Sequence, residues 1–265
     1  MNKKLTLAHF YPDNMNLYGD LGNIVTLLKR CQWQNIDLEI IEVKKTDKIG
    51  LKNVDIIFLG GGQDQGQKII ADDLLSRADM IKEEVEKGLV ALTICGGFQL
   101  FGKYFQTAEN ERIPGISVFD CYTTAGQKRL IGNVIVDTEQ SAKEWLPMAE
   151  FPHYKPSRTT LVGFENHSGQ TILGDNCRPL GKIIKGFGNQ GDSKLEGGVY
   201  KNAFGTYLHG SLLPKNPWFA DHLIALAYFR RYSVEVMLHE LDDSVEISAH
   251  EAALLRAETA KTVSI

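Results

Sequence analysis

The sequence predicts an α/β protein with a central, largely parallel sheet. Short apolar runs with β-branched residues alternate with amphipathic helical patterns through the first hundred residues. This alternation is typical of parallel strands joined by right-handed crossovers. From about residue 115, short strand patterns separated by glycines and polar turns replace it and indicate a mainly antiparallel extension of the sheet.

The expected elements of the first half follow from these patterns. Strands are expected at residues 5–10, 38–43, 54–59 and 89–94. Helices are expected at residues 22–33, with Asp20 as the N-cap, and at residues 69–87. Functional groups of an open parallel sheet gather outside the carboxyl ends of its strands, so we expect the site at that edge.

The second half is expected to contain strands at residues 116–122, 130–136, 159–164 and 183–187, with residues 186–198 as the most flexible loop. A last strand at residues 204–209 ends on a histidine. A helix is expected at residues 218–232, with Pro217 in its first turn, and a helical segment over about residues 233–265. We find no linker that divides the chain, and we expect one domain over residues 1–265.

Composition excludes several classes of function. The net charge is −4 and the pI is near 6.0, with lysines and arginines spread along the chain, so nucleic acid is not an expected partner. No apolar run approaches the roughly 20 residues of a membrane span. The four cysteines, Cys31, Cys95, Cys121 and Cys177, are widely scattered. This spacing argues against a metal site and for a reducing compartment, and we expect a cytoplasmic protein.

Cys95 is the strongest candidate for a nucleophile. An apolar strand ends on this thiol, two glycines follow, and a helical pattern begins. A sharp strand-to-helix turn exposes one side chain above the sheet edge, and glycines permit the close backbone approach around it. The N–H groups at the start of the helix favour the thiolate form. The alternative is a buried cysteine at a strand end, without chemistry.

A thiolate nucleophile needs an imidazole beside it. His209 is the best candidate, because it ends a strand and precedes Gly210 at the same predicted sheet edge. Its alternative role is a strand-end histidine without chemistry. His167 is the main rival, although its neighbours Glu165 and Asn166 favour a local hydrogen-bonded turn there.

Three glycines, Gly60, Gly61 and Gly62, directly follow the strand expected at residues 54–59. Their backbone N–H groups, together with that of Gly96, can stabilise an oxyanion. The alternative is that the three glycines only form a tight turn after the strand. Their predicted position one strand away from the nucleophile favours the oxyanion-binding role.

The segment from Cys95 to Gln99 resembles the nucleophile segment of class I glutamine amidotransferase domains, especially those of the cobyric acid synthase branch. Their C-x-G-x-Q core is matched by Cys95, Gly97 and Gln99. Segments 18–23, 60–65, 164–167 and 207–210 make the chain similar to the glutaminase subunits of lipid II isoglutaminyl synthases. The resemblance covers about residues 5–231 and implies a three-layer, flavodoxin-like domain.

The resemblance implies that Cys95 attacks the side-chain amide of L-glutamine, forming a γ-glutamyl thioester and releasing ammonia, with His209 as general acid and base. It also implies that an arginine binds the substrate, and Arg129 is the matching position, although a surface charge is the alternative. The candidate substrate-binding residues are Arg129, Gly61, Gly62, Gly96 and Gln99. No metal site is expected.

The resemblance further implies a heterodimer with a Mur-ligase-like synthetase subunit. That partner would use ATP and Mg to activate the α-carboxyl of D-glutamate in the lipid II stem peptide, and ammonia would convert it to D-isoglutamine in peptidoglycan synthesis. No cofactor is therefore expected in this chain, and lipid II is reached through the partner.

One departure concerns the third member of the triad. Most class I domains have His-x-Glu, whereas this chain has His209, Gly210 and Ser211. The missing carboxylate can come from Asp20, from Glu165 or from the partner. We expect the partner to supply it, because this would couple ammonia release to assembly of the complex.

Three other functions remain open from the sequence. The chain can be the glutaminase component of a corrinoid amide synthase, although it contains no G-x-x-x-x-G-K-[ST] loop. It can be a non-catalytic docking subunit with the same fold. It can also be a thiol chaperone or peptidase with a similar turn.

Overall fold

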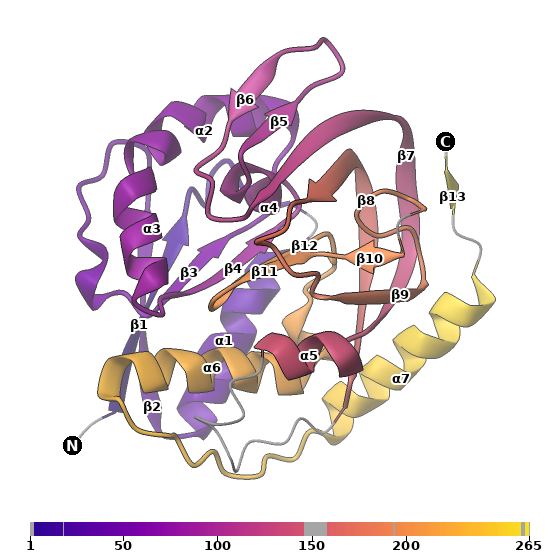
Figure 1. The fold of residues 1–265 in the computed structure, drawn as a ribbon. Coiled ribbons are helices and arrows are strands. Elements are labelled where there is room, and N and C mark those ends of the chain that lie inside the picture. The colour runs from indigo at the N-terminus through magenta and orange to yellow at the C-terminus, as the bar shows by residue number, and fades with distance from the viewer. Residues whose placement is uncertain (1–2, 18, 146–157, 193, 261–262, 265) are drawn as a thin grey trace.

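The computed structural model describes residues 3–17, 19–145, 158–192, 194–260 and 263–264. Tyr18 and His153 lie outside the described residues. The fold is α/β, as the sequence predicts, and Figure 1 shows helices on both sides of a central sheet.

The central sheet has six strands in the order β11-β12-β4-β3-β1-β2. Their bounds are Lys3–Phe10 (β1), Ile36–Val43 (β2), Ile56–Leu59 (β3), Val90–Ile94 (β4), Gly198–Tyr200 (β11) and Ala203–Thr206 (β12). All neighbouring strands run parallel except β11 and β12. The order of the first four strands is the flavodoxin-like one, so the predicted fold class is confirmed.

Two helical layers enclose this sheet. Their bounds are Leu21–Trp33 (α1), Asp64–Ser76 (α2), Ala78–Glu86 (α3), Gly96–Phe101 (α4) and Pro217–Tyr232 (α6). Ile56 and Phe58 belong to the apolar core beneath α1 and α6, whereas Ile57 and Leu59 belong to the core beneath α2, α3 and α4. Successive side chains of a strand point to opposite faces, so the strands are apolar on both sides.

A second, mainly antiparallel sheet has seven strands around the long strand β7. Their bounds are Tyr104–Gln106 (β5), Arg112–Pro114 (β6), Cys121–Asp137 (β7), Thr160–Leu173 (β8), Gly181–Lys185 (β9), Leu195–Glu196 (β10) and Val263–Ser264 (β13). Two isolated bridges link the regions of the two sheets: Phe164 of β8 pairs with His209, which follows β12, and Arg178, which precedes β9, pairs with Val199 of β11. The antiparallel strands are therefore present, but they form a sheet of their own beside the central one.

The helix expected at residues 69–87 is two helices, α2 and α3. They are separated at Arg77, whose N–H donates to the Leu74 carbonyl three residues back and whose side chain forms an ion pair with Asp73 at 2.8 Å. The apolar positions continue at helical spacing across the break, so the sequence pattern does not reveal it.

The strand expected at residues 116–122 is also corrected, because only its last two residues are in a strand, β7. The N–H groups of Ile116 and Ser117 donate to the carbonyls of Leu100 and Gly102. The segment therefore satisfies carbonyl groups at the end of α4 instead of pairing in a sheet.

Residues 186–198, expected as the most flexible loop, are tied down by buried polar contacts. Both carboxylate oxygens of Glu165 accept backbone N–H groups, from Phe187 at 2.7 Å and Gly188 at 2.9 Å. The Asn189 side chain exchanges two hydrogen bonds with the backbone of Gly197. Composition alone does not report these long-range partners.

The helical segment expected near residues 233–265 is helical over Ser244–Thr259 (α7), and β13 follows it. A short helix, Glu139–Trp145 (α5), lies between β7 and β8. In Figure 1, α7 runs along the edge of the second sheet.

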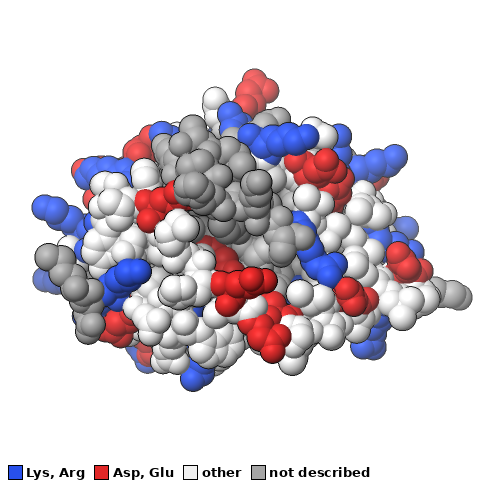
Figure 2. Space-filling model, turned by 90° about the horizontal axis from the view of Figure 1, so that it is seen from below, with Lys and Arg blue, Asp and Glu red and all other residues white. Residues whose placement is uncertain are grey.

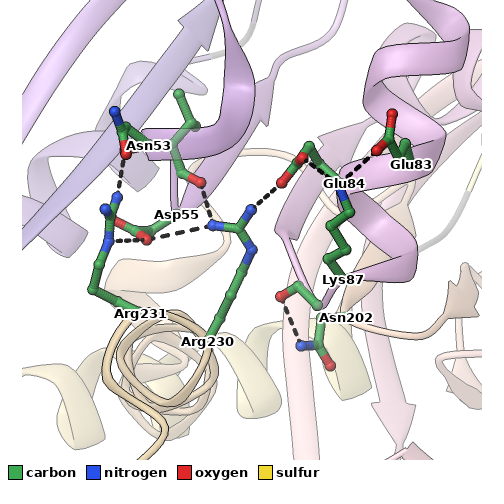
Figure 3. A network of polar contacts seen from close by, with 10 residues as sticks. Asn53, Asp55, Glu83, Glu84, Lys87, Asn202, Arg230 and Arg231 are labelled. Atoms are coloured by element: carbon green, nitrogen blue, oxygen red, sulfur yellow. Dashed lines mark hydrogen bonds and ion pairs between the residues drawn. The ribbon is translucent and has the colours of Figure 1, made fainter.

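The end of α6 is fixed to the amino-terminal side of the central sheet. Arg231 Nε donates to the buried carboxylate of Asp55 at 2.8 Å, and the same carboxylate accepts the Thr6 N–H at 2.8 Å. Arg230 reaches Glu84 of α3 at 2.5 Å. Figure 3 shows the two arginines rising from α6 to these carboxylates, so this network joins both helical layers at the edge opposite the carboxyl ends of the strands.

The charges on the face seen from below are mixed. Figure 2 shows acidic side chains gathered near its middle and basic ones mainly around its periphery, without a continuous basic area. Among the described residues, no helix is both long and apolar enough to cross a bilayer, and no cluster of three or more His, Cys, Asp or Glu side chains could hold a metal ion.

Candidate active site

Cys95 forms the turn between β4 and α4. Its backbone has φ 48° and ψ −104°, a conformation that non-glycine residues rarely adopt. Its N–H donates to the Thr206 carbonyl at 2.8 Å, so the last sheet bond is made before the chain turns. The thiol is partly exposed. Such strain concentrates at functional sites, and here it lifts one sulfur above the sheet edge.

The two glycines after Cys95 permit this turn. A Cβ added at Gly96 would lie 2.8 Å from the Gly62 carbonyl oxygen, and one at Gly97 would lie 2.5 Å from that of Leu59. Both distances are too short for a side chain. The helix α4 can therefore begin against the end of β3 only because these positions lack side chains.

The imidazole of His209 lies beside Cys95, as the sequence predicts. The His209 backbone pairs with Phe164 of β8, and its ring lies at the same cavity wall as Cys95, close enough for the two side chains to interact electrostatically. Its Nδ1 donates to Asp20 Oδ1 at 3.3 Å. Burial alone would lower the pKa of His209, but the negative charge of Cys95 and the hydrogen bond to Asp20 raise it to about 10.

The carboxylate behind His209 comes from this chain. Asp20 is fully buried, and its second oxygen accepts the Gly61 N–H at 2.7 Å. Asp20 occupies the N-cap position of α1 but makes no side-chain cap, so the expected capping role is wrong. Glu165 binds the backbone at Phe187 and Gly188 instead. The geometry thus favours Asp20 over Glu165, and over our expectation of a partner carboxylate.

A cavity of about 350 Å³ lies above this group. Its wall contains Gly62, Asp64, Gln67, Cys95, Gln99, Phe105, Arg129, Asn166, His167 and His209, among others. Five of the candidate residues therefore meet at one cavity. A larger cavity of about 740 Å³ near Arg178 and Tyr200 contains none of them, and the chemistry argues for the smaller one.

The glycines expected as oxyanion donors are not equivalent. The Gly61 N–H is engaged by Asp20, so the role expected for Gly61 is wrong. Position 61 instead requires a residue without a side chain, since a Cβ there would lie 2.7 Å from His209 Cε1. Gly62 lines the cavity, and Gly96 begins α4 next to Cys95.

Gln99 is held by a polar network that the sequence did not reveal. Its Oε1 accepts from Gln67 Nε2 at 2.9 Å, and its Nε2 donates to the Tyr207 hydroxyl at 3.2 Å. Gln67 also donates to the Gly62 carbonyl at 3.3 Å. Gln67 shares the buried stripe of α2 with Ile70, and a polar residue in such a stripe is the signal that could have identified it.

Arg129 and His167 lie on the second-sheet side of the cavity. Arg129 Nε donates to Asn166 Oδ1 at 2.6 Å. His167 lies within β8, so the local turn expected there is wrong. Its ring stacks on that of Tyr207 with centroids 3.7 Å apart, and its Nδ1 donates to the Gly169 carbonyl at 2.8 Å.

Comparison with known proteins identifies the family. Residues 6–217 match the model of the CobB/CobQ-like glutamine amidotransferase domain. The chain is 35% identical over 258 residues to the lipid II isoglutaminyl synthase (glutamine-hydrolyzing) subunit GatD of Staphylococcus aureus, covering 97% of this chain and 98% of that protein. It is 36% identical over 241 residues to the subunit of the same name from Streptococcus pneumoniae, covering 91% and 86%.

More distant similarities agree in fold. A probable cobyric acid synthase of Methanococcus maripaludis is 35% identical over 168 residues, covering 58% of this chain and 30% of that protein. The crystal structure of a glutamine amidotransferase matches with a TM-score of 0.54 at 14% identity, over 83% of this chain and 98% of that one. The region that matches the family model, residues 6–217, includes both Cys95 and His209. The chain therefore belongs to the CobB/CobQ-like glutamine amidotransferase family.

Proposed function

We propose that the chain hydrolyses L-glutamine to glutamate and ammonia, with Cys95 as the nucleophile and His209 as the general acid and base. The observation that carries this proposal is the turn at Cys95, where a strained, partly exposed thiol adjoins an imidazole backed by the buried carboxylate of Asp20. Acyl transfer through a thioester uses these three groups.

In the first half-reaction, the Cys95 thiolate attacks the carboxamide carbon of glutamine while His209 holds the thiol proton. The C–N bond of the tetrahedral intermediate then breaks, and His209 donates this proton to the departing nitrogen, which leaves as ammonia. In the second half-reaction, His209 takes a proton from water, the hydroxide attacks the thioester, and glutamate is released as the sulfur leaves. Asp20 orients the ring throughout.

Substrate recognition follows from the charges on the cavity wall. Arg129 and Asp64 are the charged side chains other than histidine among the described residues that line it. We assign the α-carboxylate of glutamine to Arg129 and its α-ammonium group to Asp64. The N–H groups of Gly62 and Gly96 stabilise the oxyanion, and Gln99 supports the wall through its contacts with Gln67.

The acceptor of ammonia is proposed from the relatives. The two GatD proteins are named as subunits of lipid II isoglutaminyl synthase, and each is similar to this chain over most of its length. We infer that a Mur-ligase-like partner activates the D-glutamate α-carboxyl of lipid II with ATP and Mg, and that ammonia from this chain converts it to D-isoglutamine. We place this heterodimer in the cytoplasm, because the partner would use ATP and because the four cysteines of this chain are free, as is usual in a reducing compartment.

The corrinoid alternative has weaker support. The match to the probable cobyric acid synthase covers 30% of that protein, whereas the match to the Staphylococcus aureus subunit covers 98%. A non-catalytic docking subunit would not need a strained thiol beside an imidazole. The glutaminase proposal therefore explains more of the site.

Glutamine hydrolysis by this chain, alone and with its synthetase partner, tests the proposal. We expect glutamate and ammonia in equal amounts and covalent labelling of Cys95 by a diazoketone analogue of glutamine. With partner, ATP and lipid II, we expect amidated lipid II. The absence of both hydrolysis and labelling would overturn the glutaminase activity. Hydrolysis without lipid II amidation by the complex would overturn only the acceptor.

A further inference from the structure

Glu196 is a buried carboxylate that the proposed reaction does not use. It lies in β10, within the segment 186–198, and none of its surface is exposed. Its Oε1 accepts two hydrogen bonds, one from the Thr206 hydroxyl at 2.6 Å and one from the Tyr207 N–H at 2.7 Å. The second sheet thus reaches the strand that leads to His209.

The segment after Thr206 needs such a partner. The strand β12 ends at Thr206, so the N–H groups of Tyr207 and Leu208 lie beyond the sheet, and both residues are fully buried. Buried N–H groups must be paired. The Thr206 hydroxyl donates to Glu196 and accepts the Leu208 N–H at 3.1 Å. One carboxylate oxygen therefore fixes both residues, directly for Tyr207 and through Thr206 for Leu208.

The same segment connects the two reacting side chains. The Thr206 carbonyl accepts the Cys95 N–H at 2.8 Å. Three residues later, the His209 N–H donates to the Phe164 carbonyl at 2.7 Å, and the His209 carbonyl accepts the Phe164 N–H at 3.2 Å. Each described backbone N–H from Tyr207 to His209 therefore has a fixed partner, so the position of the imidazole depends on this segment.

We propose that Glu196 is a positioning residue for the glutaminase reaction inferred above, because with the Thr206 hydroxyl it fixes residues 206–208 and holds the His209 ring against Cys95. Glu196 and Thr206 are not among the described residues that line the cavity. Their loss should therefore lower the rate of the chemical step and leave substrate binding unchanged.

An acceptor oxygen, and not a full negative charge, is what this role requires. Oε2 of Glu196 has no hydrogen-bond partner among the described residues, so the contacts depend on Oε1 alone. Burial, together with the charge of Glu165 on β8, raises the pKa of Glu196 to about 7, although the hydrogen bonds from Thr206 and Tyr207 act in the opposite direction. A glutamine at position 196 would keep the acceptor and the shape.

Two matched pairs of variants test the proposal. Glu196→Gln and Thr206→Ser keep the acceptor and the hydroxyl, whereas Glu196→Leu and Thr206→Val remove them at similar volume. We expect kcat to fall about 10- to 100-fold in the Leu and Val variants, because a displacement of about 1 Å has this effect on catalysis. KM should stay within about 3-fold, and the Gln and Ser variants should stay near wild type.

A second readout separates positioning from general damage. In Thr206→Val, the alkaline limb of the kcat profile should move to lower pH, because His209 loses contact with Cys95 and Asp20. In Thr206→Ser, which keeps the hydroxyl, the limb should stay at its wild-type position. Circular dichroism checks folding, and the Thr206 pair carries the test if Glu196→Leu does not fold. The proposal is overturned if folded Thr206→Val has wild-type kcat, if the loss lies in KM, or if Glu196→Gln is as impaired as Glu196→Leu.

Alkylation of Cys95 by iodoacetamide at one fixed pH distinguishes this inference from the proposed function, since it needs no glutamine. Slower alkylation in the Val variant than in the Ser variant supports the positioning role even if glutamine is not the substrate. Equal alkylation in both overturns it. A wild-type chain that does not hydrolyse glutamine contradicts the proposed function alone.

Discussion

Two histidines line the cavity, each close to a buried carboxylate, and the two pairs differ in how the carboxylate is held. His209 Nδ1 lies 3.3 Å from Asp20 Oδ1 on the side of the parallel sheet. His167 Nε2 lies 3.8 Å from Glu165 Oε2 on the side of the second sheet. All four residues are nearly or fully buried.

The difference lies in the backbone around each carboxylate. Asp20 uses one oxygen for the Gly61 N–H and presents the other to His209. Both oxygens of Glu165 accept backbone N–H groups, and the Nδ1 of His167 donates to the Gly169 carbonyl. Residue type alone therefore does not identify a catalytic pair, because the same groups can hold a loop in place.

The largest expected effect separates the two histidines. His209→Gln should lower kcat about 10⁴-fold or more, as should Cys95→Ala, because triad members act as a unit. His167→Gln should change kcat by less than about 10-fold, since the proposed reaction moves no proton through His167. The rate of glutamate release gives kcat for each variant. A comparable loss in His167→Gln would assign chemistry to the second pair and break the comparison.

The two carboxylates give the next largest effect. Asp20→Asn should lower kcat about 10²- to 10⁴-fold, because the amide cannot orient and stabilise the imidazolium. Glu165→Gln should leave kcat near wild type but destabilise the fold by about 2 kcal/mol, since its amide group would face a backbone N–H. Steady-state kinetics measures kcat, and urea unfolding measures the free energy of unfolding. A large loss of kcat in Glu165→Gln with little loss in Asp20→Asn would contradict our interpretation.

The parallel half of the fold could be predicted from the sequence because its signals are local. Apolar runs give the strands, and the thiol followed by Gly96 and Gly97 gives the turn. The approximate position of His209 follows from its place at a strand end. Each of these inferences needs only neighbouring residues and the rule that sites lie at the carboxyl ends of parallel strands.

The remaining features depend on partners distant in sequence. The sequence offers Asp20 both as an N-cap and as one of three sources of the triad carboxylate, and only its contacts with Gly61 and His209 select it. Glu196 resembles a loop residue until β12 is beside it. The break at Arg77 leaves the hydrophobic period intact. Hydrophobic periodicity reports which face of an element is buried, but it does not report which polar groups meet there.

The pH dependence sharpens the comparison with a smaller effect. In the proposed reaction the imidazolium of His209 holds the proton that ammonia takes, so kcat/KM should fall as pH rises through the pKa of this ring in the free protein, which is about 10. Asp20→Asn removes a charge that raises this pKa, and the alkaline limb should move down by about 1 to 2 pH units. Glu165→Gln should leave the limb unchanged. Profiles of kcat/KM against pH check this, and equal shifts in both variants would contradict it.

The smallest expected effect concerns binding on the second-sheet side. Arg129 donates to Asn166, next to His167, and lines the cavity. Arg129→Ala should raise KM for glutamine about 10-fold with kcat nearly unchanged, because the lost interaction is made equally in the ground and transition states. Arg112→Ala, an exposed arginine outside this cavity, serves as the control. If Arg129→Ala lowered kcat instead, this side of the cavity would contribute to the chemical step, and the division between the two pairs would fail.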